Sequence, residues 1–297
     1  MSRLRIAGLI DLVSVTSPAA IAQIASDPRM DRRYEVRGPL VNRLVWRRLA
    51  SILSHEGKLL PTIAPREDPE RGRRQRESEE MLSERARRLD PAAVRRLADY
   101  VRGGGPRSDA GRLAQQAIGR LFVPGYRATP ASWAAAELLE AGASSFNPLR
   151  RLYWALTGRV GKARALLAAM VAGDRTALHA TGIAVHNLAE SLANMRDLCG
   201  DPALRARLSS HAAVARALVA PAQILRQPEE AGETAGGLRF GRDSLVRLRL
   251  RAARARDPGA GPPLMRGSWS ACPARDWVPA LLAAVWRQAA KEGGDAL

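Results

Sequence analysis

The sequence predicts a mainly α-helical fold, and three observations support this prediction. Aromatic residues make up only 4% of the 297 residues, so the core must consist mostly of Ala, Leu and Val, which suit packed helices. Apolar residues recur at intervals of three and four over long stretches. Pro, Gly and Asp-Pro pairs divide these stretches into segments of helical length. With 46% hydrophobic residues the chain can bury a substantial core, as one large domain or two small ones.

The first third of the chain contains two helices with clear start signals. Ser17-Pro18 opens one of them, and Asp90-Pro91 opens another that ends at Gly103. An Asp at the N-cap followed by Pro in the first turn favours a helix start. Between them, the charge run at 65–80 is typical of a solvated face or a flexible loop.

The middle and last thirds predict further helices and one β-hairpin. The expected helices span 109–122, 130–141 behind Thr129 as cap, 149–172, 175–198 and 202–219. After Pro221 the pattern changes. Apolar and polar residues alternate within 238–240 and within 245–250, and 241–244 joins these segments, which predicts a hairpin with one buried face. A Gly/Pro loop at 256–263 then leads to Cys272.

Cys272 is expected at the start of a helix, with Pro273 in its first turn. The following apolar residues recur on one helical face, namely Val278, Leu281, Leu282, Val285 and Trp286. A helix N-terminus favours a thiolate, and a single cysteine thiolate is one of the few axial ligands that heme iron accepts. The alternative is that Cys272 is a small buried apolar residue.

Composition limits the partners and the compartment. The formal charge is +18, but the basic residues are almost all Arg and are spread along the chain. This distribution favours a basic docking face for an acidic protein partner over nucleic acid. Two cysteines cannot form a disulfide framework, and no Cys/His cluster suggests zinc. No apolar stretch is long enough to span a bilayer, and we expect a cytoplasmic protein.

The order of elements in the second half resembles the cytochrome P450 heme-thiolate family. A long helix, a helix opened by Asp201-Pro202, a break at Pro221, a hairpin and a Cys-Pro-x-Arg segment follow one another as in that family. The stretch 221–226 with 236–246 is similar to its strand region after helix K. Upstream, 68–76 is similar to the segment that enters its helix C.

The resemblance implies a single P450-like domain over 1–297 that binds heme b. Cys272 would be the proximal iron ligand, and Arg226 corresponds to the strand arginine that holds a heme propionate. Arg76, or a neighbour in the run 71–76, would be the second propionate partner. Arg suits this role because its guanidinium binds carboxylates with two hydrogen bonds.

The family also implies a distal face on the helix expected at 178–198. A kink there is followed in the family by an acid and a Thr, and 182–187 occupies that place here. Gly182 would lie at the kink, while His186 or Asn187 replaces the Thr. Such a His or Asn could act as an acid and base on a peroxide bond. The alternative for His186 is a solvent-facing or satisfied pocket position.

Several family positions differ in this chain. The motif F-x-x-G-x-R-x-C-x-G has Met265, Ser268, Ser270 and Ala274 at its other fixed positions. The E-x-x-R motif is absent, and the loop that normally packs on it has no room between Pro258 and Cys272. We therefore expect a domain truncated in this meander and in the access loops.

The leading hypothesis is a heme-thiolate oxidoreductase that acts on a small organic substrate with oxygen or peroxide. An acidic, ferredoxin-like protein would serve as redox partner. The first alternative is a heme-free, degenerate P450-like protein that binds and activates a partner enzyme. The second alternative is an Arg-rich nucleic-acid binder, which would show steeply salt-dependent binding.

Overall fold

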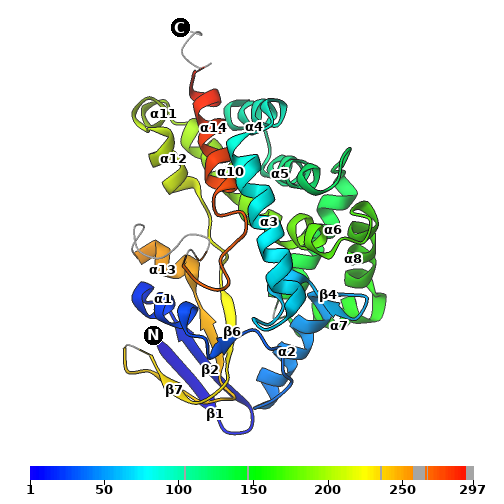
Figure 1. Ribbon diagram of the computed structural model, residues 1–297, viewed down its shortest axis with the longest axis vertical. Helices are drawn as coiled ribbons and strands as arrows, with labels where there is room; N and C mark the ends of the chain where they lie inside the picture. The colour runs from blue at the N-terminus through cyan, green and yellow to red at the C-terminus, as the bar shows by residue number, and fades with distance from the viewer. Residues whose placement is uncertain (104, 146, 235, 257–264, 266, 292–297) are drawn as a thin grey trace. The chain divides into compact units, whose positions relative to one another are not determined.

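The computed structural model describes residues 1–103, 105–145, 147–234, 236–256, 265 and 267–291 (Figure 1). The chain forms two compact units, each built from two parts of the sequence. The first unit comprises residues 1–76 and 220–272, and the second comprises 77–219 and 273–297. The fold is mainly helical, which confirms the prediction. Most of the Gly/Pro loop expected at 256–263 lies outside the described residues.

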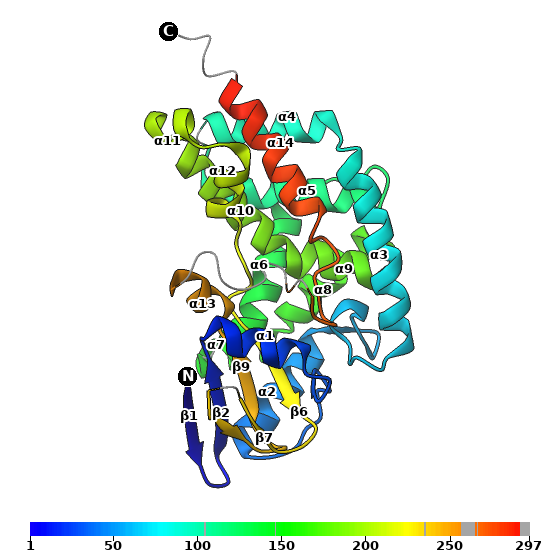
Figure 2. The same ribbon diagram turned by 60° about the vertical axis from the view of Figure 1, so that its left-hand side comes forward.

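A five-stranded sheet organises the first unit (Figure 2). Its strands, in spatial order, are β1 (Ser2–Ile6), β2 (Ile10–Val15), β9 (Leu245–Leu248), β6 (Ile224–Pro228) and β3 (Met30–Asp31). β2 and β9 are parallel, with Leu12 opposite Leu245, and the other pairs are antiparallel. Two short ladders complete the strands, namely β4 (Ser54–His55) with β5 (Lys58–Leu59), and β7 (Gly232–Glu233) with β8 (Arg239–Phe240).

Helices cover this sheet through apolar side chains. α1 (Pro18–Ser26) and α13 (Leu250–Arg256) share a buried cluster with Val13 of β2 and Val246 of β9. α2 (Leu40–Ile52) buries Trp46 against Tyr34 and Leu245 in a second cluster. The short helix η1 (Pro61–Ile63) follows β5. Since both clusters are built on β2 and β9, the sheet is the core of this unit.

The predicted hairpin between 238–240 and 245–250 is wrong in its pairing. The turn exists, because the Gly241 amide donates to Ser244 Oγ at 2.8 Å. However, β8 pairs with β7, and β9 lies between β2 and β6 in the main sheet. Alternation identifies a half-buried strand but does not identify its partner.

The second unit is a helical assembly (Figure 1). Its helices are α4 (Pro91–Gly103), α5 (Arg107–Phe122), α6 (Pro130–Ser144), α7 (Pro148–Thr157), α8 (Arg159–Met170), α9 (Arg175–His179), the π-helical turn η2 (Ala180–Ala184), α10 (Val185–Cys199), α11 (Pro202–Arg207), α12 (Ser210–Ala217) and α14 (Trp277–Lys291). α3 (Pro69–Arg87) begins in the first unit and ends in the second. α10 packs against α5 and α12, and α14 packs against α4 and α12. Among the described helices, none has the length and apolar character needed to cross a bilayer.

Three predicted elements differ from the structure. The expected helix 149–172 is divided at Gly158, whose positive φ of 63° ends α7 and begins α8. The expected helix 202–219 is divided before Ser209, which caps α12 through the amide of Ala212. Of the two alternatives for the charge run at 65–80, only the flexible loop is wrong, because most of the run lies in α3.

Candidate functional site

Cys272 lies in an irregular segment and not at a helix cap. It is half-buried, residues 273–276 form turns, and α14 begins only at Trp277. The prediction that Pro273 occupies the first turn of this helix is therefore wrong. Pro279 explains the later start, since a helix begun at Pro273 would place Pro279 in its interior, where it removes a hydrogen bond and clashes with the preceding turn. With a start at Trp277, Pro279 falls within the first turn.

Three long side chains of the first unit hold the segment that precedes Cys272. Arg71 Nη2 donates to the carbonyl of Trp269 at 2.8 Å, and Gln75 Nε2 donates to the carbonyl of Ala271 at 2.9 Å. Arg226 Nη2 donates to Ser270 Oγ at 2.5 Å. Arg71 and Gln75 lie one turn apart on α3, and Arg226 lies on β6. The residues next to Cys272 are thus fixed by a helix and a strand.

The indole ring of Trp269 collects three guanidinium groups. The guanidinium carbons of Arg71, Arg226 and Arg32 lie 4.6, 4.9 and 5.2 Å from the ring centroid. A cation over an indole face is attracted by the negative face of the ring. We refer to Arg32, Arg71, Arg226 and Trp269 as the arginine cluster.

The arginine cluster contains more hydrogen-bond donors than it has acceptors. Arg226 is fully buried and Arg71 is 4% exposed. Within the described part of the chain, the Nε atoms of all three arginines and the indole Nε1 of Trp269 have no hydrogen-bond partner. Buried polar groups are normally paired, so four orphaned donors around one ring indicate a missing acceptor.

The electrostatics of the arginine cluster point to the same conclusion. Burial lowers the pKa of Arg71 to about 10, with a further contribution from the charge of Arg32. Burial also lowers the pKa of Arg226, again with Arg32 acting in the same direction. The negative charge of Asp31 acts against burial, because it favours a higher pKa at all three arginines. Arg71 and Arg226 are buried and Arg32 is half-buried, and among the described residues Asp31 is the one carboxylate that acts on all three. The cluster therefore has an excess of positive charge, which an anion would offset.

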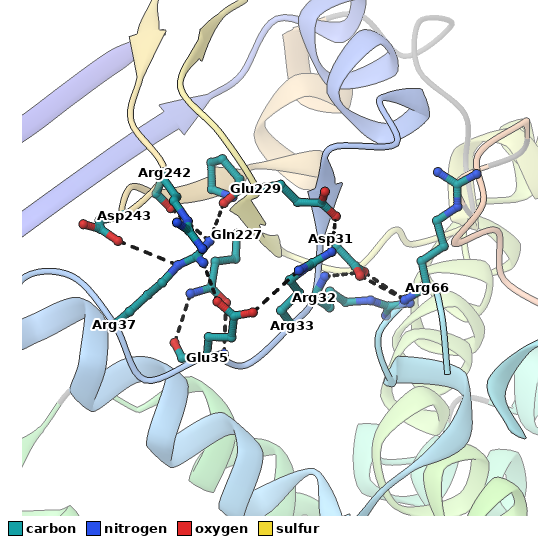
Figure 3. Close-up of polar contacts among 11 residues, drawn as sticks. Asp31, Arg32, Arg33, Glu35, Arg37, Arg66, Gln227, Glu229, Arg242 and Asp243 are labelled. Atoms are coloured by element: carbon teal, nitrogen blue, oxygen red, sulfur yellow. Dashed lines mark hydrogen bonds and ion pairs between the residues drawn. The ribbon is translucent and has the colours of Figure 1, made fainter. Parts of the chain in front are cut away.

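Asp31 is already engaged by backbone donors (Figure 3). It is 2% exposed, and its carboxylate accepts from the amide of Arg66 at 3.0 Å and from the amide of Arg32 at 2.6 Å. The side chain of Arg66 extends away from Asp31 in this view. Asp31 therefore shapes the backbone around Arg32, and among the described residues it forms no ion pair within the arginine cluster.

Paired polar contacts join the segment after Asp31 to β6 (Figure 3). The amide of Glu35 donates to Gln227 Oε1, and Gln227 Nε2 donates back to the carbonyl of Glu35, each at 3.0 Å. Arg33 Nη2 bonds to Glu229 at 2.5 Å, and Arg37 Nη2 donates to the carbonyl of Pro228 at 2.6 Å. These contacts fix the chain that bears Arg32 against the strand that bears Arg226.

Of the two arginines expected to bind carboxylates, the structure places only Arg226 in the arginine cluster. Arg76 is exposed on α3, whereas Arg71 in the same run is buried on Trp269. If the charge run is treated as a helix, residues 71 and 75 lie on one face and residue 76 lies on another. The sequence could therefore have distinguished Arg71 from Arg76. Arg32 and Trp269 carry no local signal in the sequence.

The predicted distal residues lie in the second unit, where η2 and α10 meet. The π-helical turn contains Gly182 at the place where the resemblance implies a kink. Gly182 allows close packing, since a Cβ there would lie 3.1 Å from Leu167 Cδ1 and 3.2 Å from Leu139 Cδ1. Single π turns within α-helices often mark functional positions.

His186 and Asn187 point to different sides of α10. The His186 ring packs on Trp133 of α6 at 4.9 Å between centroids, and its Nε2 lies 3.1 Å from the carbonyl of Ala136. Burial lowers the pKa of His186. Asn187 lies on a half-buried face together with Ile183 and Glu190. Both side chains are half-buried, and His186 has its partners on α6.

The fold of the chain is similar to that of cytochromes P450. No family model and no curated protein matches the sequence. Among solved structures, the cytochrome P450 enzyme CxnD for C–S bond formation in chuangxinmycin biosynthesis is 16% identical, with a TM-score of 0.59 over 93% of this chain and 79% of that one. CYP154C4 from Streptomyces sp. W2061 is also 16% identical, with a TM-score of 0.61 over 97% and 83%. The tirandamycin C-bound P450 monooxygenase TamI is 14% identical, with a TM-score of 0.58 over 93% and 81%. These likenesses confirm the predicted fold class.

Proposed function

We propose that the protein is a heme-thiolate oxidoreductase in which Cys272 ligates the iron and the arginine cluster binds the heme carboxylates. The observation that carries the proposal is the set of unpaired donors on Arg71, Arg226 and Trp269, next to the segment that ends in Cys272. Neutral ligands would leave the excess positive charge in place. A cofactor that carries carboxylates and a metal that binds thiolates would match both the unpaired donors and the nearby Cys272.

The residues present fit heme b. Its two propionates would accept from the guanidinium Nε atoms and the indole Nε1, which have no partner among the described residues. Arg71 takes the role that the resemblance implied for Arg76. When bound, heme would supply the oxidation of a small organic molecule with oxygen or peroxide. A small organic substrate is supported by the similarity to TamI, which is described as bound to tirandamycin C.

In the second unit, Asn187 is the side chain for which the catalytic role implied by the resemblance is still proposed. Its amide can both donate and accept a hydrogen bond, so it can orient a polar group of a substrate or hold a water. His186 is not assigned a proton-transfer role, since its Nε2 already contacts the Ala136 carbonyl. An acidic redox partner remains part of the proposal, because the formal charge of +18 would attract one.

The test is the absorption spectrum of the protein loaded with heme, first oxidised and then reduced under carbon monoxide. We expect a strongly red-shifted Soret band for the wild type and for Cys199→Ala, and its loss in Cys272→Ala. Cys199 is the matched control, because it is the other cysteine of the chain and is buried in α10.

Two results would contradict the proposal. If Cys272→Ala keeps the thiolate-type spectrum, Cys272 is not the ligand. If the folded wild type takes up no heme, the proposal fails as a whole, and a heme-free auxiliary protein becomes the better explanation. In that case Cys272→Ala should bind the partner enzyme as well as the wild type does.

A further inference from the structure

We infer that Arg32 supplies the carboxylate-binding cation that the cytochrome P450 cysteine motif would place at position 270, and that Trp269 holds it there. The inference rests on the proposed heme site and assigns Arg32 and Trp269 their individual roles within the arginine cluster. The motif has an Arg two positions before the cysteine, and this chain has Ser270. Ser270 is instead an acceptor, since its Oγ binds Arg226 Nη2.

Arg32 reaches the arginine cluster from a distant part of the sequence. It follows β3, and its Nη2 donates to the carbonyl of Thr62 at 3.2 Å. Its guanidinium carbon lies 5.2 Å from the centroid of Trp269, the residue next to Ser270. Ser270 is uncharged, and Arg32 thus supplies the positive charge that an Arg at position 270 would have supplied.

The position of Arg32 is imposed by its neighbours and is not a chance contact of a mobile side chain. The amide of Arg32 donates to Asp31, and the Gln227–Glu35 pair joins the following residues to β6. The indole of Trp269 then offers an apolar surface on which the planar guanidinium can stack. Both the backbone and the ring therefore orient Arg32.

Bringing Arg32 beside Arg226 is unfavourable unless an anion is bound. Arg226 is fully buried, Arg32 is half-buried with a buried Nε, and the charge of Arg32 lowers the pKa of Arg226. The two guanidiniums and the indole N–H together offer only donors, which is the complement of a carboxylate. The site is therefore complementary to an anion, and a carboxylate of the proposed heme would satisfy it.

The experiment measures the equilibrium affinity for heme by titration, followed by the Soret band and by quenching of Trp fluorescence. We expect Arg32→Gln to weaken heme binding by about 10- to 100-fold, the range for losing hydrogen bonds to a charged group. Adding Ser270→Arg to Arg32→Gln should restore much of the affinity. Arg29→Gln is the matched control, because Arg29 lies on the same segment, is exposed, and pairs with Asp27 and Glu230 outside the arginine cluster.

A second ligand separates charge recognition from an effect on folding. Heme whose two propionates are methyl esters carries no carboxylate. We expect it to bind the wild type and Arg32→Gln with equal affinity. A difference between the two proteins that persists with the ester would overturn the inference, because Arg32 would then act through the fold and not through a carboxylate.

The remaining outcomes distinguish this inference from the proposed function. If the wild type binds heme through Cys272 but Arg32→Gln binds it equally well, the role of Arg32 is overturned and the proposed function stands. If Ser270→Arg gives no recovery in the Arg32→Gln background, the equivalence of the two positions is overturned. If the wild type binds no heme, both the proposed function and this inference fail.

Discussion

At the scale of single residues, the buried arginines lower the stability of the protein as long as no anion is bound to them. A guanidinium that leaves water loses hydration, and this loss is offset only by complete hydrogen bonding and an opposite charge. Arg226 has partners at the carbonyl of Leu225 and at Ser270, but its Nε has none among the described residues. An anion would supply both the missing acceptor and the missing charge.

His186 predicts a dependence of stability on pH. Burial lowers its pKa below the ordinary value of 6.5, so the unfolded chain binds a proton at a pH where the folded ring does not. The stability is therefore complete above pH 6.5 and decreases as the pH falls below it. We expect the unfolding temperature of the wild type to fall more steeply between about pH 7 and pH 5 than that of His186→Gln.

The control for this prediction is His211→Gln, since His211 is exposed on α12. Its pH curve should follow that of the wild type. Glu137 and Glu140 on α6 also act on His186 and oppose the effect of burial. If the unfolding temperatures of the wild type and His186→Gln depend on pH in the same way, these carboxylates cancel the effect of burial on the pKa of His186.

At the scale of elements, the joint between α7 and α8 depends on glycine. Gly158 has φ of 63°, and no atom lies within 4 Å of the place where its Cβ would be. Backbone strain is then the main cost of a side chain there, and we expect Gly158→Ala to reduce the free energy of unfolding by about 1 kcal/mol. Denaturant titration measures this change.

Gly161 provides the matched control for Gly158. It lies within α8, has ordinary helical geometry and has the same open space around it. We expect Gly161→Ala to increase the free energy of unfolding by about 0.5–1 kcal/mol. If both substitutions change stability in the same direction, the difference in backbone conformation is not the cause.

Most helices could be predicted from sequence because their signals are local. Ser17-Pro18, Asp90-Pro91 and Thr129-Pro130 each precede an observed helix, namely α1, α4 and α6. Thr129 also forms a reciprocal capping box with Ser132. Such signals lie within a few residues of the element that they start.

The sheet and half of the candidate site could not be predicted, because their contacts are not local. β2 pairs with β9 across most of the chain, and neither strand carries information about its partner. In the same way, Arg32 and Trp269 meet only after folding. Cys272 and Arg226 were predicted as site residues from their order relative to the P450 family, and their functional roles remain proposals.

At the scale of the whole molecule, the charge is strongly unbalanced. With 47 basic and 29 acidic residues, the formal charge is +18. Self-repulsion of this kind favours expanded states and is weakened by salt. We expect the unfolding temperature to rise from low to physiological concentrations of sodium chloride.

The surface ion pairs act in the opposite direction, since salt also weakens attractions. They are exposed pairs such as Arg239 with Glu233, which contribute little to stability. Repulsion should therefore dominate. An unfolding temperature that falls with added sodium chloride would show that attractive pairs matter more than the net charge.

The pairing of β2 with β9 also determines when the first unit can form during synthesis on the ribosome. Val15 lies opposite Leu248, so the hairpin of β1 and β2 emerges long before the strand that it needs. The helices from α4 to α12 are made in the interval, and the hydrogen bonds within each helix are local and form quickly. Until β9 emerges, β2 presents an unpaired edge that other chains could bind. The growing chain therefore carries this open edge until β9 has been made.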